Sequence, residues 1–364
     1  SGVWIMAYTT IDDPSAFFTT TLYTGNATDN RAITNSANAG NFQPDWLWYK
    51  ERSSTSSHRI FDSSRGASKR IEPDTNTGEE TDTSNQKSFD SNGFTVGTSG
   101  STNANGDTYV AWQWKANGGT TTSFNESGNN PAGAHQANTT AGFSIVTYTG
   151  TGGNGTVAHG LGAKPNVMLQ KKLGGAASWV VYHDKIASDP ATDYLELNGT
   201  IGAVDYATHF NDTEPTSTVF TVGTDGAVNG DGVTNVMYCF TEIKGYSKFG
   251  SYTGNGAQDG TFVYTGFKPA WILIKRTDTN GKNWYIADST RSPSNITKAF
   301  LSPNLNSAED TSGDATDAYF DILSNGFKLR QDFSHLNASG ATHIYMAFAE
   351  HPFVSSKGVP TTAR

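Results

Sequence analysis

"YTGNGAQDGTFVYTGFKPAWILIKR" occupies residues 252–276, and its motifs decide the fold. The tripeptide Tyr-Thr-Gly begins at Tyr252, and it also begins at Tyr23 and Tyr148. After each of these three copies comes a proline that precedes a short apolar run. A fourth copy begins at Tyr264, inside the quoted stretch. Self-similarity of this kind indicates repeated structural units, so the sequence predicts three internal repeats.

Further motifs recur in the same order after the first and third copies. "FQPDWLWYK", "DSSR" and "SNGF" in the first repeat correspond to "FKPAWILIK", "DSTR" and "SNGF" in the third. The second repeat is more diverged: it keeps the proline in "AKPNVMLQKK", but "HDK" at His183 replaces the Asp-Ser pair. We expect the recurring residues to lock each repeat rather than to bind a ligand. They are Asp62, Arg65, Asp288, Arg291, Pro44, Pro165, Pro269, Gly93 and Gly326.

The local sequence pattern is that of β-strands joined by tight turns. Runs such as "DWLWYK" and "WYIAD" are aromatic and β-branched, and Asn-Gly pairs separate several of them. Aromatic residues make up 12% of the chain and charged residues only 16%, which does not suit a helical bundle. The sequence predicts an all-β protein of tandem antiparallel β-sandwich units that are jelly-roll-like. Whether the units form separate sandwiches or share sheets stays open.

We expect Tyr-Thr-Gly to end the first strand of each unit, with its glycine in a turn. The following proline would begin the next strand, where its missing N–H does least harm. The predicted organisation is an N-terminal attachment segment that packs on a neighbour (1–22), β-sandwich repeat 1 (23–116), a linker or long loop (117–140), β-sandwich repeat 2 (141–245), β-sandwich repeat 3 (246–353) and a C-terminal tail (354–364).

Charge and cysteine content exclude several classes of protein. The net charge of −9 comes without a basic stripe, so a nucleic-acid partner is not expected. No apolar run reaches the roughly 20 residues that a membrane span needs. The single cysteine, Cys239, lies in an apolar run, and we interpret it as a core residue. The histidines lack metal-ligand spacing, and Asn- and Asp-rich loops that could hold Ca²⁺ are better explained as turns, so no cofactor is expected.

The sequence does not favour an enzyme. Hydrolysis of glycosidic bonds requires two carboxylates roughly 5–10 Å apart. Glu196 and Glu242 lie in strand-like contexts, but neither has an acidic partner at an alternate position. His183 and Asp184 could orient a serine, yet no Gly-x-Ser-x-Gly turn is present. We therefore predict no catalytic residues.

Aromatic side chains that point outward from a strand would be candidate contacts for a glycan or a protein partner. Trp48, Trp112 and Trp114 alternate with other large residues along predicted strands. Side chains on a strand point alternately to its two faces, so one of each such set is expected to face outward. These three tryptophans are therefore the candidate contact residues, and a core position is the alternative for each.

The motifs together resemble a repeated β-domain family of virion structural proteins from tailed bacteriophages, mostly marine ones. The similar elements span nearly the whole chain, and they include "IDDPSAFF" at Ile11, "FQPDWLWYK" at Phe42, "GFKPAWILIKRTD" at Gly266, "LSNGFKLR" at Leu323 and "IYMAFAEHPF" at Ile344. The resemblance implies a component of the phage particle surface, associated with the capsid or with a tail fibre. It supplies no catalytic residues, and the ending "VSSKGVPTTAR" departs from the family pattern.

Three functions of different classes are weighed from this interpretation. The first is a virion structural protein, either a capsid decoration, a short fibre or a tail-associated spike, that attaches to capsid or tail proteins. A homo-oligomer is expected, with a trimer as the arrangement for a fibre. The alternative is a receptor-binding module of a tail fibre that recognises host-surface polysaccharide, with repetition giving avidity. A polysaccharide depolymerase is the third and least favoured reading.

Overall fold

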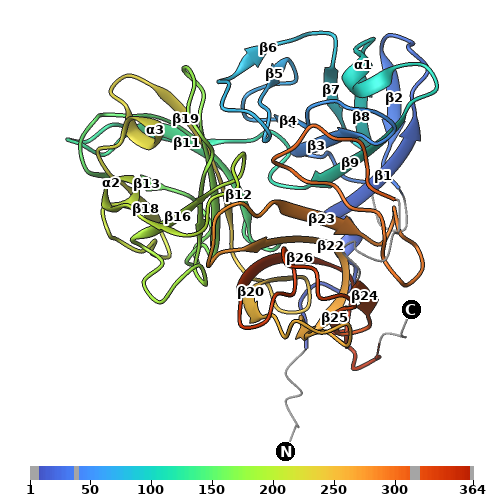
Figure 1. The fold of residues 1–364 in the computed structure, drawn as a ribbon. Helices are drawn as coiled ribbons and strands as arrows, with labels where there is room; N and C mark the ends of the chain where they lie inside the picture. The colour runs from blue at the N-terminus through green and yellow to red at the C-terminus, as the bar shows by residue number, and fades with distance from the viewer. Residues whose placement is uncertain (1–7, 37–40, 312–319, 361–364) are drawn as a thin grey trace, which may run out of the picture.

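The computed structural model describes residues 8–36, 41–311 and 320–360, and within them the chain is built almost entirely of antiparallel β-sheets (Figure 1). The helices are single turns: η1 (Pro14–Ala16), α1 (Gly100–Asn103), α2 (Ala207–Phe210) and α3 (Gly226–Asn229). The predicted all-β sandwich fold is therefore confirmed.

Three large sheets share one strand order. The first runs β1 (Phe18–Thr24), β9 (Thr108–Trp114), β3 (Trp46–Glu51), β4 (Arg59–Asp62). The third runs β20 (Ser247–Thr253), β26 (Thr342–Pro352), β22 (Phe267–Arg276), β23 (Trp284–Asp288). The second contains the same arrangement as β12 (Phe143–Thr149), β19 (Thr234–Phe240), β14 (Val167–Lys172), β15 (Val180–His183). We call the parts of the chain that hold these sheets unit 1 (β1–β9), unit 2 (β10–β19) and unit 3 (β20–β26); they form the three lobes of Figure 1.

A smaller sheet covers one face of each large sheet. These sheets are β2 (Arg31–Thr34), β8 (Gly93–Val96), β7 (Gln86–Asp90) in unit 1; β13 (Gly155–Ala158), β18 (Val219–Val222) in unit 2; and β21 (Phe262–Tyr264), β25 (Gly326–Leu329), β24 (Phe320–Leu323) in unit 3. Unit 1 also has a two-stranded sheet, β5 (Lys69–Arg70) with β6 (Glu80–Thr81). Phe94, Phe220 and Phe327 each bury their rings in the core of their own unit. Each unit is thus a small sandwich with its own core.

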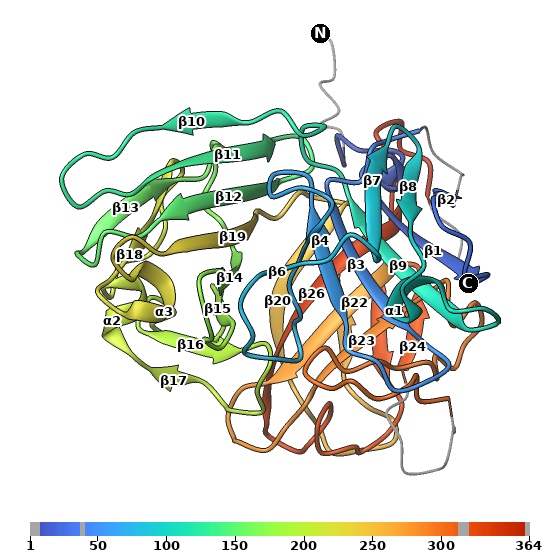
Figure 2. The same cartoon turned by 90° about the horizontal axis from the view of Figure 1, so that it is seen from above.

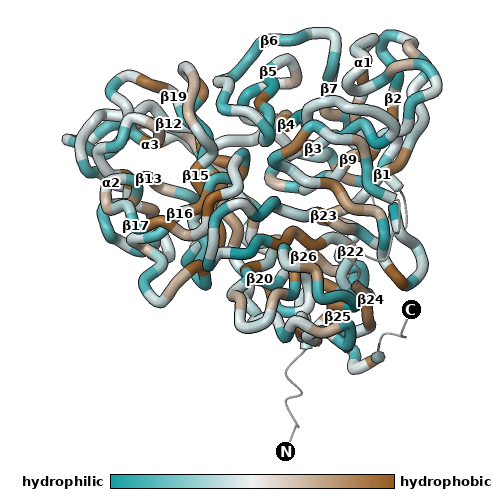
Figure 3. The backbone as a smooth tube through the Cα atoms, in the orientation of Figure 1, coloured by the Kyte–Doolittle hydropathy of each residue, from teal (hydrophilic) through white to brown (hydrophobic). Residues whose placement is uncertain are grey.

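The opposite faces of the three large sheets pack together into one central core. Its members come from every unit and include Trp46, Trp114, Tyr238, Trp271 and Phe348. The Trp46 ring lies 4.5 Å from Trp114 and 4.8 Å from Tyr238, between ring centroids. The three units lie around this shared centre in Figure 1, and seen from above unit 1 lies over unit 3 with unit 2 beside them (Figure 2). Hydrophobic stretches follow inner strands such as β15 and β22 (Figure 3). Separate sheets therefore share a core, which settles what the sequence left open.

The tyrosines of the three repeated Tyr-Thr-Gly motifs have the same partner in each unit. Each motif ends the strand that begins the shared order of four strands, β1, β12 or β20, as predicted. The hydroxyl groups then donate to a backbone carbonyl just before a buried asparagine: Tyr23 to Thr102 at 2.7 Å, Tyr148 to Val228 at 2.7 Å and Tyr252 to Leu336 at 2.6 Å. These contacts fasten the first strand to the turn that leads into the last strand.

The buried asparagine completes the same contact. Asn229 accepts a hydrogen bond from the Thr151 N–H and donates to the carbonyls of Gly153 and Gly223. Asn103 and Asn337 hold the equivalent loops of units 1 and 3 in the same way. Because the amide satisfies several backbone groups at once, it serves where an apolar side chain would leave them unpaired.

The glycine of the motif is required by close packing rather than by turn conformation. A Cβ atom on Gly150 would lie 2.4 Å from the carbonyl oxygen of Gly230, and Gly25 and Gly254 have the same lack of room. Gly266 differs, since it adopts a φ of +83° in the turn between β21 and β22. The fourth copy of the tripeptide is therefore not part of the repeated lock.

The prolines and the Ser-Asn-Gly-Phe turns lie close to their predicted places. Pro44 and Pro165 precede β3 and β14 by two residues. Pro269 lies inside β22 at an irregularity in its pairing with β26, where strands tolerate proline. Gly93 and Gly326 begin the second strand of a hairpin, and a Cβ on either would lie 2.0 Å from a carbonyl oxygen of the neighbouring strand.

Two predicted segments are corrected by the structure. Residues 117–140 are not a linker, because β10 (Thr122–Phe124) and β11 (Ala132–Asn138) extend the large sheet of unit 2, which β16 (Asp193–Glu196) and β17 (Val204–Asp205) extend on the other side. Residues 8–22 pack on the chain itself, because Ile11 and Phe18 are buried in the central core. Residues 1–7 of that segment lie outside the described residues. The tail folds back, since the Ser356 N–H donates to Asp12 at 2.6 Å.

Candidate functional site

The Asp-Ser-x-Arg motif of unit 1 binds across to unit 2. Asp62 is the last residue of β4, and the Arg65 guanidinium donates to its carboxylate at 2.5 Å. The Tyr238 hydroxyl, from β19 of unit 2, donates to the same carboxylate at 2.7 Å. Arg65 also forms an ion pair with Glu79 at 3.1 Å. We call the contact between units 1 and 2 junction 1–2, and we name the other two contacts between units in the same way. Junction 1–2 is closed by a buried charge network in which each charged group has a partner.

The same motif of unit 3 binds across to unit 1. Asp288 ends β23, and it accepts hydrogen bonds from Arg291 and from the indole Nε1 of Trp112 in β9, the latter at 3.0 Å. The Arg291 guanidinium lies over the Trp112 ring, 5.3 Å from its centroid, and pairs with Glu309 at 3.0 Å. Junction 3–1 thus repeats junction 1–2 with tryptophan in place of tyrosine.

Unit 2 makes the corresponding contact to unit 3 with a histidine. His183 pairs with Val167 just as Asp62 pairs with Trp46, so the two residues are equivalent. The third unit has Met346 at the position of Tyr238, and methionine has no proton to donate to a carboxylate. His183 instead lies 3.2 Å from the backbone carbonyl of Tyr345 through Nε2. Its Nδ1 accepts from the Lys185 N–H, so Nε2 carries the proton and donates.

Junction 2–3 also lacks the ion pair that fills the other two. Ile186 stands three residues after His183, where Arg65 and Arg291 follow their aspartates. Ala203 donates its N–H to the Thr277 carbonyl at 2.7 Å, as Glu79 does to Leu173 and Glu309 to Arg52. Ala203 therefore occupies the position that a glutamate holds at the other two junctions. Ile186 occupies the position of the arginine that pairs with that glutamate.

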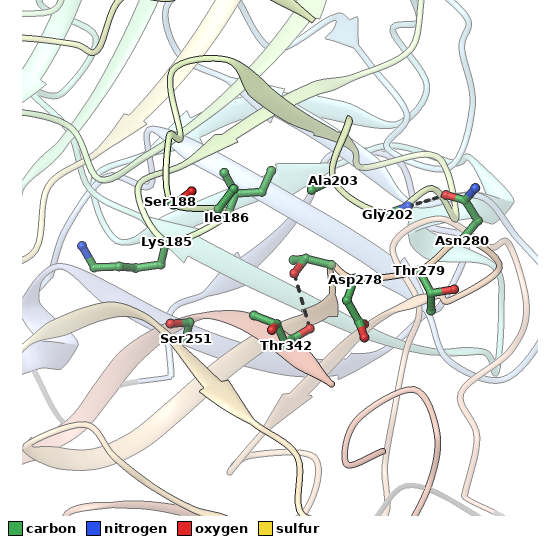
Figure 4. Close-up of a pocket in the computed structure, with 12 residues that line it drawn as sticks. Lys185, Ile186, Ser188, Gly202, Ala203, Ser251, Asp278, Thr279, Asn280 and Thr342 are labelled. Carbon is green, nitrogen blue, oxygen red and sulfur yellow. Dashed lines mark hydrogen bonds between the residues drawn. The ribbon is translucent and has the colours of Figure 1, made fainter. Parts of the chain in front are cut away.

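A cleft of about 840 Å³ occupies junction 2–3 as a result (Figure 4). The corresponding space at junction 1–2, which Arg65 and Glu79 line, measures about 330 Å³. Hydroxyl groups dominate the cleft lining; they belong to Ser188, Ser251, Thr277, Thr279 and Thr342. The walls are tied together by the Gly202 N–H, which donates to the Asn280 side chain at 2.8 Å. A cleft of this size and polarity could hold a small polyhydroxylated ligand.

Two charged side chains line the cleft, and both already have partners. Lys185 pairs with Asp184 at 3.0 Å. Asp278 accepts hydrogen bonds from Arg276, and these lower the pKa of the Asp278 carboxyl below its usual range. The cleft is therefore close to neutral, with one carboxylate among its described lining residues and no carboxylate pair.

Comparison with known proteins places the chain in a family. The model of a family described as a domain of unknown function, DUF7483, matches residues 13–352. The chain belongs to the DUF7483 family. The match runs from η1 to the end of β26, so the three units and all three junctions belong to the DUF7483 domain. No curated protein matches the chain.

The three tryptophans predicted as surface contacts of this DUF7483 domain are core residues instead. Trp48 and Trp112 are completely buried, and Trp114 is 1% exposed. At these positions both faces of the large sheet are covered, one by the small sheet of unit 1 and the other by the central core, so alternation along β3 and β9 brings none of the three tryptophans to the surface. Trp48, Trp112 and Trp114 cannot contact a glycan in this structure.

The carboxylates considered for catalysis lie apart from the cleft. Glu196 belongs to β16, and its backbone carbonyl accepts from the Trp284 indole at 2.8 Å. Glu242 follows β19 and pairs with Lys248 at 2.7 Å. In the described ranges, no cluster of three or more histidine, cysteine or acidic side chains could hold a metal ion. In the same ranges, no helix is long and apolar enough to cross a membrane.

Three buried lysines are a repeated feature that sequence reasoning missed. Lys50, Lys171 and Lys275 occupy the same position near the ends of the equivalent strands β3, β14 and β22, and all are completely buried. Burial lowers the pKa of each ammonium to about 8. Each donates to backbone carbonyls, for example Lys171 to Asn76 of unit 1 at 3.1 Å. The signal was a lysine after every apolar run that follows the repeated proline.

Proposed function

We propose that this DUF7483 protein is a structural component of a tailed-phage particle that acts by protein–protein attachment. Capsid decoration, a short fibre and a tail-associated spike all fit this role. The observation that supports it best is the ring of three junctions, in which each unit is held to the next by buried polar contacts. Such a body suits a building block that must keep its shape, and its buried charges are used for locking rather than for chemistry.

Repetition of the fold within one chain bears on the partners. Three units already surround one core, so the chain offers three related outer surfaces without assembling with copies of itself. The partners that we propose are capsid or tail proteins, and sister chains as a trimer in the case of a fibre. Sedimentation velocity of the purified chain distinguishes a trimer from a monomer.

The experiment that tests the particle proposal is gold labelling of the protein on intact phage, viewed by electron microscopy. Label scattered over the head would identify a decoration, and label at the tail or its tip would identify a fibre or spike. Particles without any label would contradict the proposal.

A second candidate function is a receptor-binding module that recognises host-surface glycans. The cleft at junction 2–3 favours it, because hydroxyl and amide groups line a space that is larger than the corresponding space at junction 1–2. The variant Ile186→Arg with Ala203→Glu rebuilds the missing ion pair and closes the cleft. Glycan binding that persists in this variant would show that the cleft is not the glycan-binding site. We do not propose a depolymerase, since neither Glu196 nor Glu242 lines the cleft.

A further inference from the structure

The outer face of the three-stranded sheet in unit 3 carries two exposed aromatic rings. On β21 the side chains alternate, so that Val263 is buried while Phe262 is 45% and Tyr264 53% exposed. Positions two apart on a strand point to the same side, about 7 Å from one another. The two rings therefore form a short apolar strip on the surface, which we call the unit-3 strip.

The other two units show that the fold does not require this strip. Val263 pairs with Phe327 in unit 3 as Val157 pairs with Phe220 and Ile33 pairs with Phe94. The residues that flank those positions are Ala32 and Thr34 in unit 1, Thr156 and Ala158 in unit 2, and Phe262 and Tyr264 in unit 3. Small side chains thus serve the sheet in two units, and the aromatic rings need another explanation.

One ring of the strip is held in place by the N-terminal segment. The Tyr8 hydroxyl donates to the Gly266 carbonyl at 2.8 Å. Its oxygen lies 3.2 Å from the Tyr264 hydroxyl, which is therefore the donor in that contact. A ring fixed before binding loses less conformational entropy when a ligand packs on it.

Two cations border the strip, although the chain carries a net charge of −9. Lys328 lies opposite Phe262 on β25, and Arg330 lines a neighbouring groove of about 330 Å³. Each has one carboxylate partner: Asp259 pairs with Lys328 at 2.5 Å and Asp321 with Arg330 at 3.4 Å. The pairs are partly exposed, so an incoming anion can compete for the cations at little cost.

We propose that the unit-3 strip and its cations bind an acidic polysaccharide, whose sugar rings pack on Phe262 and Tyr264 while its carboxylates meet Lys328 and Arg330. Aromatic rings offer flat apolar area to the C–H faces of sugars, and a cationic rim selects anionic chains. The inference deepens the receptor-binding function proposed above, and it rests on a different surface from the cleft, so the two can fail separately.

The test is affinity electrophoresis of the full chain in gels that contain polygalacturonate, a uronic-acid polymer, or neutral dextran. We expect retardation by polygalacturonate alone, and we expect added salt to weaken it. Phe262→Ala with Tyr264→Ala should weaken binding about fivefold or more. Lys328→Gln with Arg330→Gln should do the same, whereas Tyr206→Ala, which removes an exposed ring in unit 2, should leave binding unchanged.

Three results would overturn the inference. One is the absence of retardation by polygalacturonate while circular dichroism shows a folded chain. Another is binding that persists in both double variants but disappears in Ile186→Arg with Ala203→Glu, which would assign the saccharide to the cleft and preserve the receptor-binding function. The third is a dimer in sedimentation velocity that Phe262→Ala with Tyr264→Ala dissociates, since the strip would then be a contact between copies of the chain.

Discussion

Trp112 and Asp288 lie 176 residues apart, yet the indole Nε1 of the first donates a hydrogen bond to the carboxylate of the second at 3.0 Å. The contact joins unit 1 to unit 3, and Tyr238 with Asp62 makes the same contact between units 2 and 1. Where Met346 takes the place of the aromatic donor, its partner position holds His183 rather than an aspartate. The two sides of each junction therefore match in chemistry, which explains why "HDK" departs from the repeat.

Trp112→Phe should destabilise the chain more than Trp114→Phe does. Both substitutions remove similar volume from the same strand, but the Trp114 Nε1 has no acceptor among the described residues. A hydrogen bond to a buried carboxylate contributes about 1.5–3 kcal/mol to stability. Trp112→Phe should therefore lower the free energy of unfolding by about 2 kcal/mol more than Trp114→Phe does. Urea denaturation followed by circular dichroism measures the difference. Equal losses would show that the junction contact adds nothing to stability.

Gly150→Ala should destabilise unit 2 strongly, whereas Gly226→Ala should not. A Cβ at Gly150 would overlap the Gly230 carbonyl, while at Gly226 it would meet no atom within 4 Å. We expect a loss of more than about 2 kcal/mol in the first case, because backbone must move. Gly226→Ala should be neutral or stabilising by about 0.5 kcal/mol. Thermal unfolding of both variants checks this, and a tolerated Gly150→Ala would contradict the close packing of the motif.

Acid should weaken junction 2–3 through His183. Burial lowers the pKa of His183 to about 4, below the value near 6.5 of an unfolded histidine. Its neutral form therefore contributes stability that is complete above pH 6.5 and is lost as the pH falls towards 4. The unfolding free energy of the wild type should drop across this range more steeply than that of His183→Gln. The exposed His351→Gln serves as control and should keep the wild-type slope.

Alkaline conditions should stabilise the chain through the buried lysines. The folded pKa of Lys275 is about 8 and the unfolded value about 10.4, so the unfolded chain binds more protons between these values and stability rises with pH. Lys275→Met should flatten the rise between pH 8 and 9.5, and the exposed Lys357→Met should not. Measurements stay below pH 10, because burial raises the pKa of tyrosines such as Tyr246 and reverses the trend there. A wild-type stability that falls from pH 8 to 9.5 would contradict the buried charges.

The strand pattern and the ends of the repeated motifs could be predicted because they depend on local sequence. Tyr-Thr-Gly ends a strand in each unit as expected. Asp62 with Arg65 was expected to lock its own repeat, and the structure places this pair at the contact between units 1 and 2. The role of the motif glycine could not be predicted, because it depends on a carbonyl about 80 residues away along the chain, as for Gly150 and Gly230.

Alternation of side chains misled the prediction of surface aromatics. Leu47 and Trp48 point to opposite faces of β3, and both are completely buried, since a core lies on each side of the sheet. On β21, by contrast, one face is free, and Phe262 and Tyr264 reach the surface there. The fourth Tyr-Thr-Gly, at Tyr264, was visible in the sequence, but nothing local told it apart from the three structural copies.

The cleft could not be predicted without the tertiary structure. Ile186, Ala203 and Thr277 meet there from two units, and none of them is unusual in its own segment. The visible signal was the loss of Asp-Ser-x-Arg at His183, which showed that one junction differs but not that a space would open beside it.

The central claim, that three units form one body around a shared core, is tested most directly by differential scanning calorimetry of the full chain. The account predicts one transition whose calorimetric and van't Hoff enthalpies agree, and Trp112→Phe should lower the temperature of that whole transition. Separate transitions for the units, with Trp112→Phe moving only some of them, would contradict it.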